Sequence, residues 1–220
     1  MNIASNMIEP MNSPSSDNIV GVILAGGQSR RFGGGDKFIE ELKGEPLVDR
    51  VIERVRSQTR QLIISTNIET PHLTKFKLPI VADAVQGQAG PLAGILAGME
   101  WTRDHTTDYE WIVSFPTDAP FVPLDCVVKM LKQAVSDNAE IVCAASGGRT
   151  HPVCALWRVD LAENLRQAMV KEDMRKIDLW TARHRLSVLE FPDQPFDPFF
   201  NINRPEDLAQ AEIILSELSG

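Results

Sequence analysis

The sequence predicts an α/β protein built on a mostly parallel central sheet. An aliphatic run that begins at Ile19 has little polarity, which is the pattern of a strand buried on both faces of such a sheet. A glycine-rich loop, an amphipathic stretch over residues 46–55 and a second aliphatic run over residues 62–65 follow in that order. Strand, loop, helix and strand form a βαβ unit. With 220 residues, the chain is most simply one domain that buries a full core.

The loop over residues 26–37 has the composition of a phosphate-binding segment. Its glycines let the main chain approach a ligand closely, and Arg30, Arg31 and Lys37 supply positive charge for a polyanion. It is not a Walker loop, because Lys37 follows Asp36 rather than glycine, and no register gives the dinucleotide fingerprint G-x-G-x-x-G. The loop therefore indicates a triphosphate site of another class, with a solvated surface loop as the alternative.

A second glycine-rich segment follows the strand predicted over residues 78–83, which ends in the carboxylate of Asp83. We expect a helix from Pro91, whose first-turn N–H groups are free to bind a ribose or phosphate. A close contact between helix and sheet explains the small residues equally well. The helix residues expected to face inward are Leu92, Ile95, Leu96 and Met99.

A carboxylate between two prolines follows the strand predicted over residues 110–115. Asp118 lies in the segment Pro-Thr-Asp-Ala-Pro, which makes it a rigid, exposed carboxylate at the carboxyl end of the strand. Mg²⁺ prefers one or two such ligands and completes its octahedron with waters and phosphate oxygens. Asp118 is therefore the strongest metal candidate, and a turn in which the aspartate binds its own backbone is the alternative.

The rest of the chain alternates strands and helices. We expect a helix from Pro123, strands over 140–145 and 153–157 around a turn over 146–152, helices over 159–169 and 171–182, and a strand over 186–191. The inner helix faces are predicted to be Leu124, Val127, Val128, Leu131 and Val135, and near the C-terminus Leu208, Ala211, Leu215 and Leu218.

Two polar residues in this half of the chain have competing explanations. His151 is either a group that faces a substrate or a hydrogen-bonded structural histidine. Asn203, three residues before Glu206, is explained by a helix start of the capping-box type. The cap does not explain Asn201.

Composition limits the possible partners and the compartment. The net charge of −8 argues against general nucleic-acid binding, so anionic ligands must be held locally. Cys126, Cys143 and Cys154 lack metal-ligand spacing and are expected as core residues in a reducing compartment. Residues 1–18 lack the features of a secretory signal and are expected to be a disordered extension. No apolar run reaches membrane-spanning length, so we expect a cytoplasmic protein that binds no membrane.

The glycine loop also carries a family resemblance. Residues 24–37 read L-A-G-G-Q-S-R-R-F-G-G-G-D-K, which resembles the signature of the molybdenum cofactor guanylyltransferases (MobA), a branch of the nucleotidyltransferase superfamily. Further matches follow in the family's order as far as Leu208: G-x-P-L from Gly44, the strand end at Ser65 to Asn67, Asp83, G-P-L-A-G from Gly90, P-x-D-x-P around Asp118, His151-Pro152, and N-x-N-x-P-E-D-L from Asn201. The resemblance implies a Rossmann-like, three-layer αβα domain of the nucleotide-diphospho-sugar transferase type over residues 19–220.

The resemblance also implies roles for individual residues. Lys37, Asp118 and Arg31 would act in catalysis, with Mg²⁺ on Asp118. The GTP site would comprise Leu24, Ala25, Gly26, Gly27, Arg30, Lys37, Ser65, Asn67, Asp83, Gly90, Pro91, Leu92 and Asp118. The second substrate would lie near Arg149, His151, Asn201 and Asn203. The family commonly has asparagine where Ser65 stands, so this position departs from the pattern.

Such an enzyme transfers GMP from GTP to the terminal phosphate of the molybdopterin form of the molybdenum cofactor, and the resemblance further implies molybdoenzyme-maturation proteins as partners. The alternatives are a cytidylyltransferase or sugar-1-phosphate nucleotidyltransferase of the same superfamily, and a nonenzymatic carrier of finished cofactor. The second glycine of L-A-G-G, Gly27, favours the guanine branch, because those relatives usually have L-A-A-G. Lys37 and Asp118 argue against a carrier, which needs no site for metal and triphosphate. A redox dinucleotide-binding domain would need the absent fingerprint.

Overall fold

The central sheet has the mainly parallel arrangement that the sequence predicts. The computed structural model describes residues 18–218 apart from 27–36, 69, 86–89 and 107. Within these residues, seven strands form one sheet in the order β5-β4-β1-β6-β8-β7-β9. All neighbours are parallel except that β8 runs antiparallel to β6 and β7. The strands are β1 (Ile19–Leu24), β4 (Gln61–Ser65), β5 (Ile80–Val81), β6 (Trp111–Pro116), β7 (Ile141–Ser146), β8 (Arg149–Arg158) and β9 (Leu186–Phe191).

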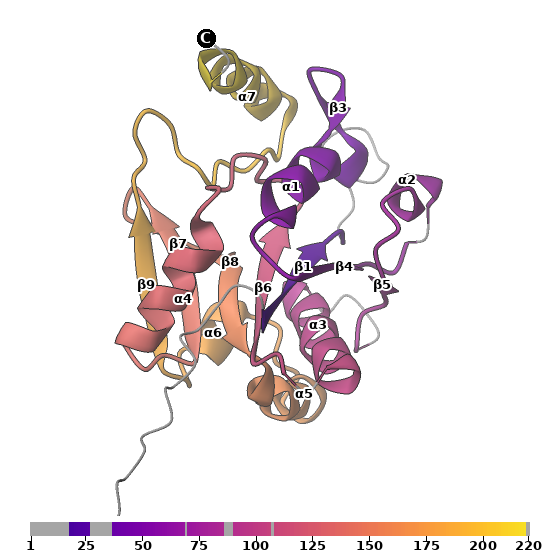
Figure 1. Ribbon diagram of the computed structural model, residues 1–220, viewed down its shortest axis with the longest axis vertical. Helices are drawn as coiled ribbons and strands as arrows, with labels where there is room; N and C mark the ends of the chain where they lie inside the picture. Colours follow the sequence, from indigo (N-terminus) through magenta and orange to yellow (C-terminus); the bar gives the residue numbers. More distant parts are fainter. Residues whose placement is uncertain (1–17, 27–36, 69, 86–89, 107, 219–220) are drawn as a thin grey trace, which may run out of the picture.

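Helices cover both faces of this sheet, which gives the predicted three layers (Figure 1). Helices α1 (Leu47–Arg56) and α4 (Cys126–Ser136) pack on one face, where a cluster of buried side chains includes Ile23, Val51 and Met130. Helices α3 (Pro91–His105), α5 (Ala162–Lys171) and α6 (Ile177–Thr181) bury Leu96 and other residues against the opposite face. The short helix α2 (Pro71–Thr74) lies between β4 and β5 in the chain, and single 3-10 turns occupy Lys37–Ile39 and Val159–Leu161.

The C-terminal helix completes a third, smaller apolar cluster. Helix α7 (Pro205–Leu218) lies near the two-stranded ribbon formed by β2 (Glu41–Leu42) and β3 (Glu45–Pro46), at the top of Figure 1. Ala211 and Ile214 of α7 pack with Leu42, Phe121 and Ile202. This packing holds α7 beside the segment that carries Asn201 and Asn203.

The predicted inner face of α4 is partly wrong. The helix begins at Cys126 rather than at Pro123, and the sheet is covered by Cys126, Val127, Met130, Leu131 and Ala134. Leu124, Val128 and Val135 are instead exposed, by 65%, 42% and 55%. The helix carries apolar residues around more than half of its surface, so the sequence did not specify which of them would face the sheet. In α7, Leu218 is likewise exposed, and the buried residue that the prediction omitted is Ile214.

Several predicted boundaries also differ. The turn between β7 and β8 consists of Gly147 and Gly148, which both have positive φ angles, of 55° and 73°. Glycine adopts this conformation without steric cost, so a two-residue hairpin is possible and β8 begins at Arg149, which places His151 inside a strand. Strand β5 has two residues rather than six, and the helix expected over 171–182 forms only at α6.

Polar groups inside the core are paired across elements. Trp157 donates its indole N–H to Ser114 Oγ at 2.9 Å, and Ser114 Oγ donates to the carbonyl of Val153 at 2.6 Å; Trp157 and Ser114 are fully buried. The three cysteines are buried and unpaired, as predicted, and burial raises the pKa of Cys143 to about 11.

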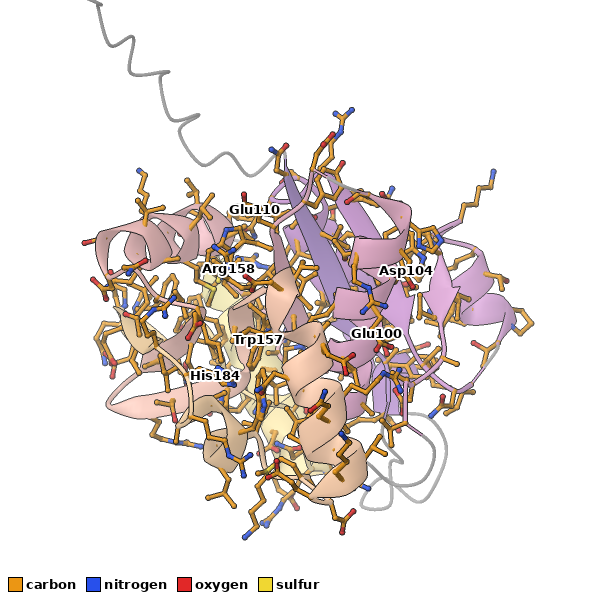
Figure 2. The ribbon with its side chains drawn as sticks, turned by 90° about the horizontal axis from the view of Figure 1, so that it is seen from below. Glu100, Asp104, Glu110, Trp157, Arg158 and His184 are labelled. Carbon is orange, nitrogen blue, oxygen red and sulfur yellow. The ribbon has the colours of Figure 1, made fainter. Side chains whose placement is uncertain are left out.

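Figure 2 views the molecule from below and labels Glu110, which directly precedes β6, and Arg158, the last residue of β8. Among the helices of the described residues, none is long and apolar enough to cross a bilayer.

Candidate active site

A cavity of about 840 Å³ lies at the carboxyl ends of the central parallel strands. Its lining includes Leu24 at the end of β1, Ser65 at the end of β4 and Asp118 just after β6. In open α/β sheets this is the edge where ligands bind. The volume lies in the range of small-molecule sites, which is about 300–1,000 Å³.

Lys37 and Asp118 meet in this cavity. The Lys37 ammonium donates to Asp118 Oδ2 at 2.5 Å and to Asn203 Oδ1 at 2.6 Å. The side chains of Lys37 and Asp118 are 18% and 20% exposed, so the ion pair is largely shielded but open to a ligand. The backbone N–H of Ile202 donates to the carbonyl of Asp118 at 2.9 Å, which docks the segment after β9 onto the end of β6. Lys37 therefore joins two parts of the chain that lie far from it in sequence, at Asp118 and at Asn203.

The predicted cap at Asn203 needs a correction. The Asp207 carboxylate, not Glu206, accepts the backbone N–H groups of Asn203 and Arg204, at 2.7 and 2.9 Å. The side chain of Asn203 points instead to Lys37. Asn203 does not line the cavity itself, but it holds a residue that does.

Asp118 fits a magnesium ligand in one specific respect. Its second carboxylate oxygen, Oδ1, is buried and has no hydrogen-bond partner among the described residues. Leaving a buried charged oxygen unpaired is costly, and a cation or a metal-bound water would satisfy it. The described part of the chain holds no group of three or more His, Cys, Asp or Glu residues arranged for a metal. Asp118 would thus be a single protein ligand, with the remaining positions left to water and substrate oxygens.

The end of β4 contributes a polar pair and a free hydroxyl. Asn67 donates to Asp83 Oδ2 at 2.7 Å, and the Asp83 N–H donates to Asn67 Oδ1 at 2.9 Å, so each residue fixes the other. Ser65 Oγ is buried at the cavity with no partner in the described structure, which leaves it available to a ligand. Thr66 also lines the cavity and donates to the carbonyl of Ala25 at 2.9 Å.

The residues expected to touch GTP at β1 and α3 divide into two groups. Leu24, Gly26, Gly90 and Pro91 line the cavity. Ala25 and Leu92 are fully buried, and the Ala25 N–H is already donated to the carbonyl of Ser65 at 2.9 Å, so the structure places both residues beneath the cavity rather than on its surface. Gly27, Arg30 and Arg31 lie outside the described residues.

The start of α3 combines both explanations that the sequence left open. A Cβ on Gly94 would lie 2.7 Å from Leu24 Cδ2 and 2.9 Å from Ser65 Oγ, so the helix lies very close to the sheet. Gly90, Pro91 and Gly94 also line the cavity. The small residues bring the N-terminus of α3 to the site by allowing the close contact.

A further part of the lining comes from β8 and the segment after β9. Arg149, His151 and Asn201 all line the cavity. Because β6 lies between β1 and β8 in the sheet, Asp118 is placed between this group and the one at β1 and β4. His151 Nε2 lies 2.7 Å from Ser146 Oγ, and burial lowers the pKa of His151.

Sequence reasoning missed several residues of the lining. They include Thr66, Thr117, Thr150 and Phe199. Ser146 and Asp197 were also missed; they do not line the cavity, but Ser146 contacts His151 and Asp197 contacts Ser146. Thr66 and Thr117 lie next to predicted residues at strand ends, and that position was the available signal. Ser146 and Asp197 are 51 residues apart, and no local pattern connects them.

Comparison with known sequences identifies a family and named relatives. Residues 21–186 match the family model described as the MobA-like NTP transferase domain. The molybdenum cofactor guanylyltransferase of Rhodopseudomonas palustris (strain BisB5) is 48% identical over 88% of this chain and 92% of the relative. The protein of the same name from Mesorhizobium japonicum is 41% identical over 92% of this chain and 98% of its own length.

Solved structures share the fold. The molybdopterin-guanine dinucleotide biosynthesis protein A from Archaeoglobus fulgidus has a TM-score of 0.71 and 24% identity over 90% of this chain and 99% of its own. A CMP:2-keto-3-deoxy-manno-octonic acid synthetase, complexed with CTP, has a TM-score of 0.66 and 14% identity over 91% of this chain and 99% of its own. At these identities the likeness shows the fold alone.

Proposed function

The chain belongs to the family of MobA-like NTP transferases, and from that premise we propose that it transfers GMP from GTP to the terminal phosphate of molybdopterin-bound molybdenum cofactor. The resemblance read from the sequence is confirmed, and the protein is a nucleotidyltransferase. The products are the guanine dinucleotide form of the cofactor and pyrophosphate. The main structural support for this proposal is the contact between Lys37 and Asp118 in the cavity. Residues at the ends of β1 and β4 line the cavity on one side of Asp118, and residues of β8 line it on the other.

The chemistry requires two anions to be held in line. An oxygen of the acceptor's terminal phosphate attacks the α-phosphorus of GTP, and the bond from that phosphorus to the oxygen bridging to the β-phosphate breaks. The acceptor is already charged, so positioning and charge neutralisation carry most of the catalysis. A lysine ammonium has three donors, and Lys37 uses two of them on Asp118 and Asn203. None of the hydrogen bonds among the described residues uses the third, which is left for a phosphate oxygen, and Arg30 and Arg31 would add further positive charge.

Magnesium belongs to this proposal through Asp118. Its unpaired oxygen Oδ1 would hold the ion, and Mg²⁺ would supply positive charge at the α-phosphate and at the departing pyrophosphate. Lys37 on Oδ2 keeps the carboxylate in one orientation, so that Oδ1 points away from the lysine.

The nucleoside end of GTP is assigned to the residues at β1, β4 and α3. Ser65 offers its hydroxyl, the Asn67–Asp83 pair offers a fixed carboxylate, and the start of α3 brings Gly90 and Pro91 to the lining. Among the described residues no atom lies within 4 Å of a Cβ built on Gly26, and Gly26 lines the cavity, so its main chain is placed to contact a ligand. A preference for CTP, or for a sugar-1-phosphate as acceptor, would place the protein in a sister branch.

We also propose a cytoplasmic location and transfer of the product to proteins that mature molybdoenzymes. The buried, unpaired cysteines support a reducing compartment.

A turnover assay tests the function. The purified protein is incubated with GTP, Mg²⁺ and molybdenum-loaded molybdopterin, and the dinucleotide and pyrophosphate are measured by chromatography and a coupled phosphate assay. We expect both products in equal amounts, with CTP replacing GTP poorly. Release of pyrophosphate with CTP but not with GTP would contradict the proposal. Binding of finished cofactor without turnover would support the carrier instead.

A further inference from the structure

A hydrogen-bonded chain of three side chains lies beside the cavity. Ser146 Oγ donates to Asp197 Oδ1 at 2.6 Å and lies 2.7 Å from His151 Nε2. Ser146 is the buried last residue of β7, Asp197 lies after β9, and His151 is in β8 and lines the cavity. The chain therefore runs from a carboxylate outside the sheet to a ring that a substrate can reach.

The carboxylate determines where each proton lies. An ionised carboxylate only accepts, and Asp197 Oδ1 also accepts the backbone N–H of Phe199 at 2.8 Å. The Ser146 hydroxyl has one proton, which it uses to donate a hydrogen bond to Asp197. In its contact with His151 the hydroxyl oxygen must therefore accept the Nε2–H. A neutral His151 then has its proton on Nε2, and Nδ1 is left as a bare acceptor.

The surroundings of His151 favour this neutral state. Burial is the largest influence on its pKa and lowers it, and the Arg149 charge lowers it further, whereas Asp197 and Glu190 raise it. The ring of Phe199 packs on the imidazole, with centroids 4.9 Å apart and planes inclined by 30°. At neutral pH the imidazole of His151, which lines the cavity, thus has one acceptor nitrogen and lies beside an aromatic ring.

We propose that Asp197 and Ser146 are positioning residues that fix the tautomer of His151, and that His151 Nδ1 accepts a hydrogen bond from the heterocycle of the acceptor substrate. This inference rests on the proposed function, in which that substrate is a pterin with ring N–H and amino donors. A bare nitrogen repels an ionised phosphate, which has only acceptors. His151 therefore selects the heterocycle, while Lys37 and Arg149 remain for the phosphates.

The tautomer is measured directly, without turnover. Histidine labelled with ¹⁵N is observed by long-range ¹H–¹⁵N correlation, and the spectrum of His151→Gln identifies the signals of His151. We expect a protonated Nε2 and a bare Nδ1 in the wild type at neutral pH, and a mixture of tautomers in Ser146→Ala. Asp197→Asn keeps an acceptor oxygen and should retain the wild-type tautomer. A wild-type spectrum with the proton on Nδ1 would overturn the proposal.

Kinetics test the contact with the substrate. Loss of one hydrogen bond should raise KM for the molybdopterin acceptor about tenfold in His151→Phe, and less in Ser146→Ala, while KM for GTP stays unchanged. His151→Gln keeps an N–H and an acceptor oxygen, so its KM for the molybdopterin acceptor should lie close to the wild-type value. Thermal unfolding of each variant checks that it folds. An inactive wild type would refute the proposed function, whereas an active wild type with the same acceptor KM in His151→Phe would refute only this inference.

Discussion

Two glycines at the contact between α3 and the sheet should have different roles, one in the stability of the fold and the other in GTP binding. Gly94 and Gly98 lie one helical turn apart and both face the sheet. A Cβ on Gly98 would lie 2.5 Å from Val22 Cγ2, and Val22 is a fully buried, β-branched residue with little freedom at χ1. A Cβ on Gly94 would meet Leu24 Cδ2 and Ser65 Oγ, and both of these residues line the cavity.

The magnitudes follow from these contacts. Overpacking costs about 1–3 kcal/mol, and alanine in place of glycine recovers about 1 kcal/mol of helix propensity. Gly98→Ala should therefore lower the unfolding free energy by up to about 2 kcal/mol, which for a chain of this size is a fall in Tm of up to about 8 °C. Gly94→Ala should cost less, because the ends of Leu24 and Ser65 can rotate, but the rotated groups enter the GTP site.

Thermal unfolding and GTP titration of the two variants test the reasoning. We expect Gly98→Ala to lose stability and keep its GTP affinity, and Gly94→Ala to keep more stability and lose about tenfold in affinity. The reverse order, or wild-type behaviour in both variants, would refute the close contact and its link to the site.

Three further predictions concern single side chains. Ser114→Ala should lower the unfolding free energy by about 1–3 kcal/mol, because the buried indole N–H of Trp157 loses its acceptor. Trp157→Phe should cost less in that background than in the wild type; chemical denaturation measures both, and equal costs in the two backgrounds would argue against the bond. Asn203→Ala should raise KM for GTP several-fold, because Lys37 loses the acceptor at 2.6 Å; unchanged kinetics would show that Asp118 alone positions the lysine. The folded-state pKa of His151 is lowered from 6.5, so its contribution to stability is present above pH 6.5 and is lost as the pH falls through the folded-state pKa. His151→Gln should therefore flatten the plot of unfolding free energy against pH in this range. An unchanged slope would contradict the prediction.

The order of strands and helices was predictable because the strongest signals were local. The aliphatic run of β1, the proline at the start of α1 and the glycines after β1 each follow from residues close in sequence. The inner face of α4 was not predictable in the same way, because Val128 and Leu131 are equally apolar and only the packed sheet distinguishes them. The long predicted turn shortened to Gly147 and Gly148 because strand pairing continued as far as the glycines allowed.

The site shows the same division. Lys37 and Asp118 were identified because a charged residue at a strand end, or in a glycine loop, is unusual enough to indicate a ligand. Asn203 was first explained as a cap, since its neighbours match a helix start, and only the folded chain brings its amide to Lys37. Ser146 and Asp197 carry no local signal, because their contact depends on the path of the chain after β9.

The central claim is that Lys37 and Asp118 form a metal-dependent site for GTP, and direct titration tests it most closely. GTP, CTP and ATP are titrated into the wild type and into Asp118→Asn by calorimetry, each with and without Mg²⁺. The account predicts that GTP binds most tightly, that Mg²⁺ strengthens its binding to the wild type, and that Asp118→Asn loses the metal dependence while it keeps its fold. Tighter binding of CTP, or the same magnesium dependence in Asp118→Asn, would contradict it.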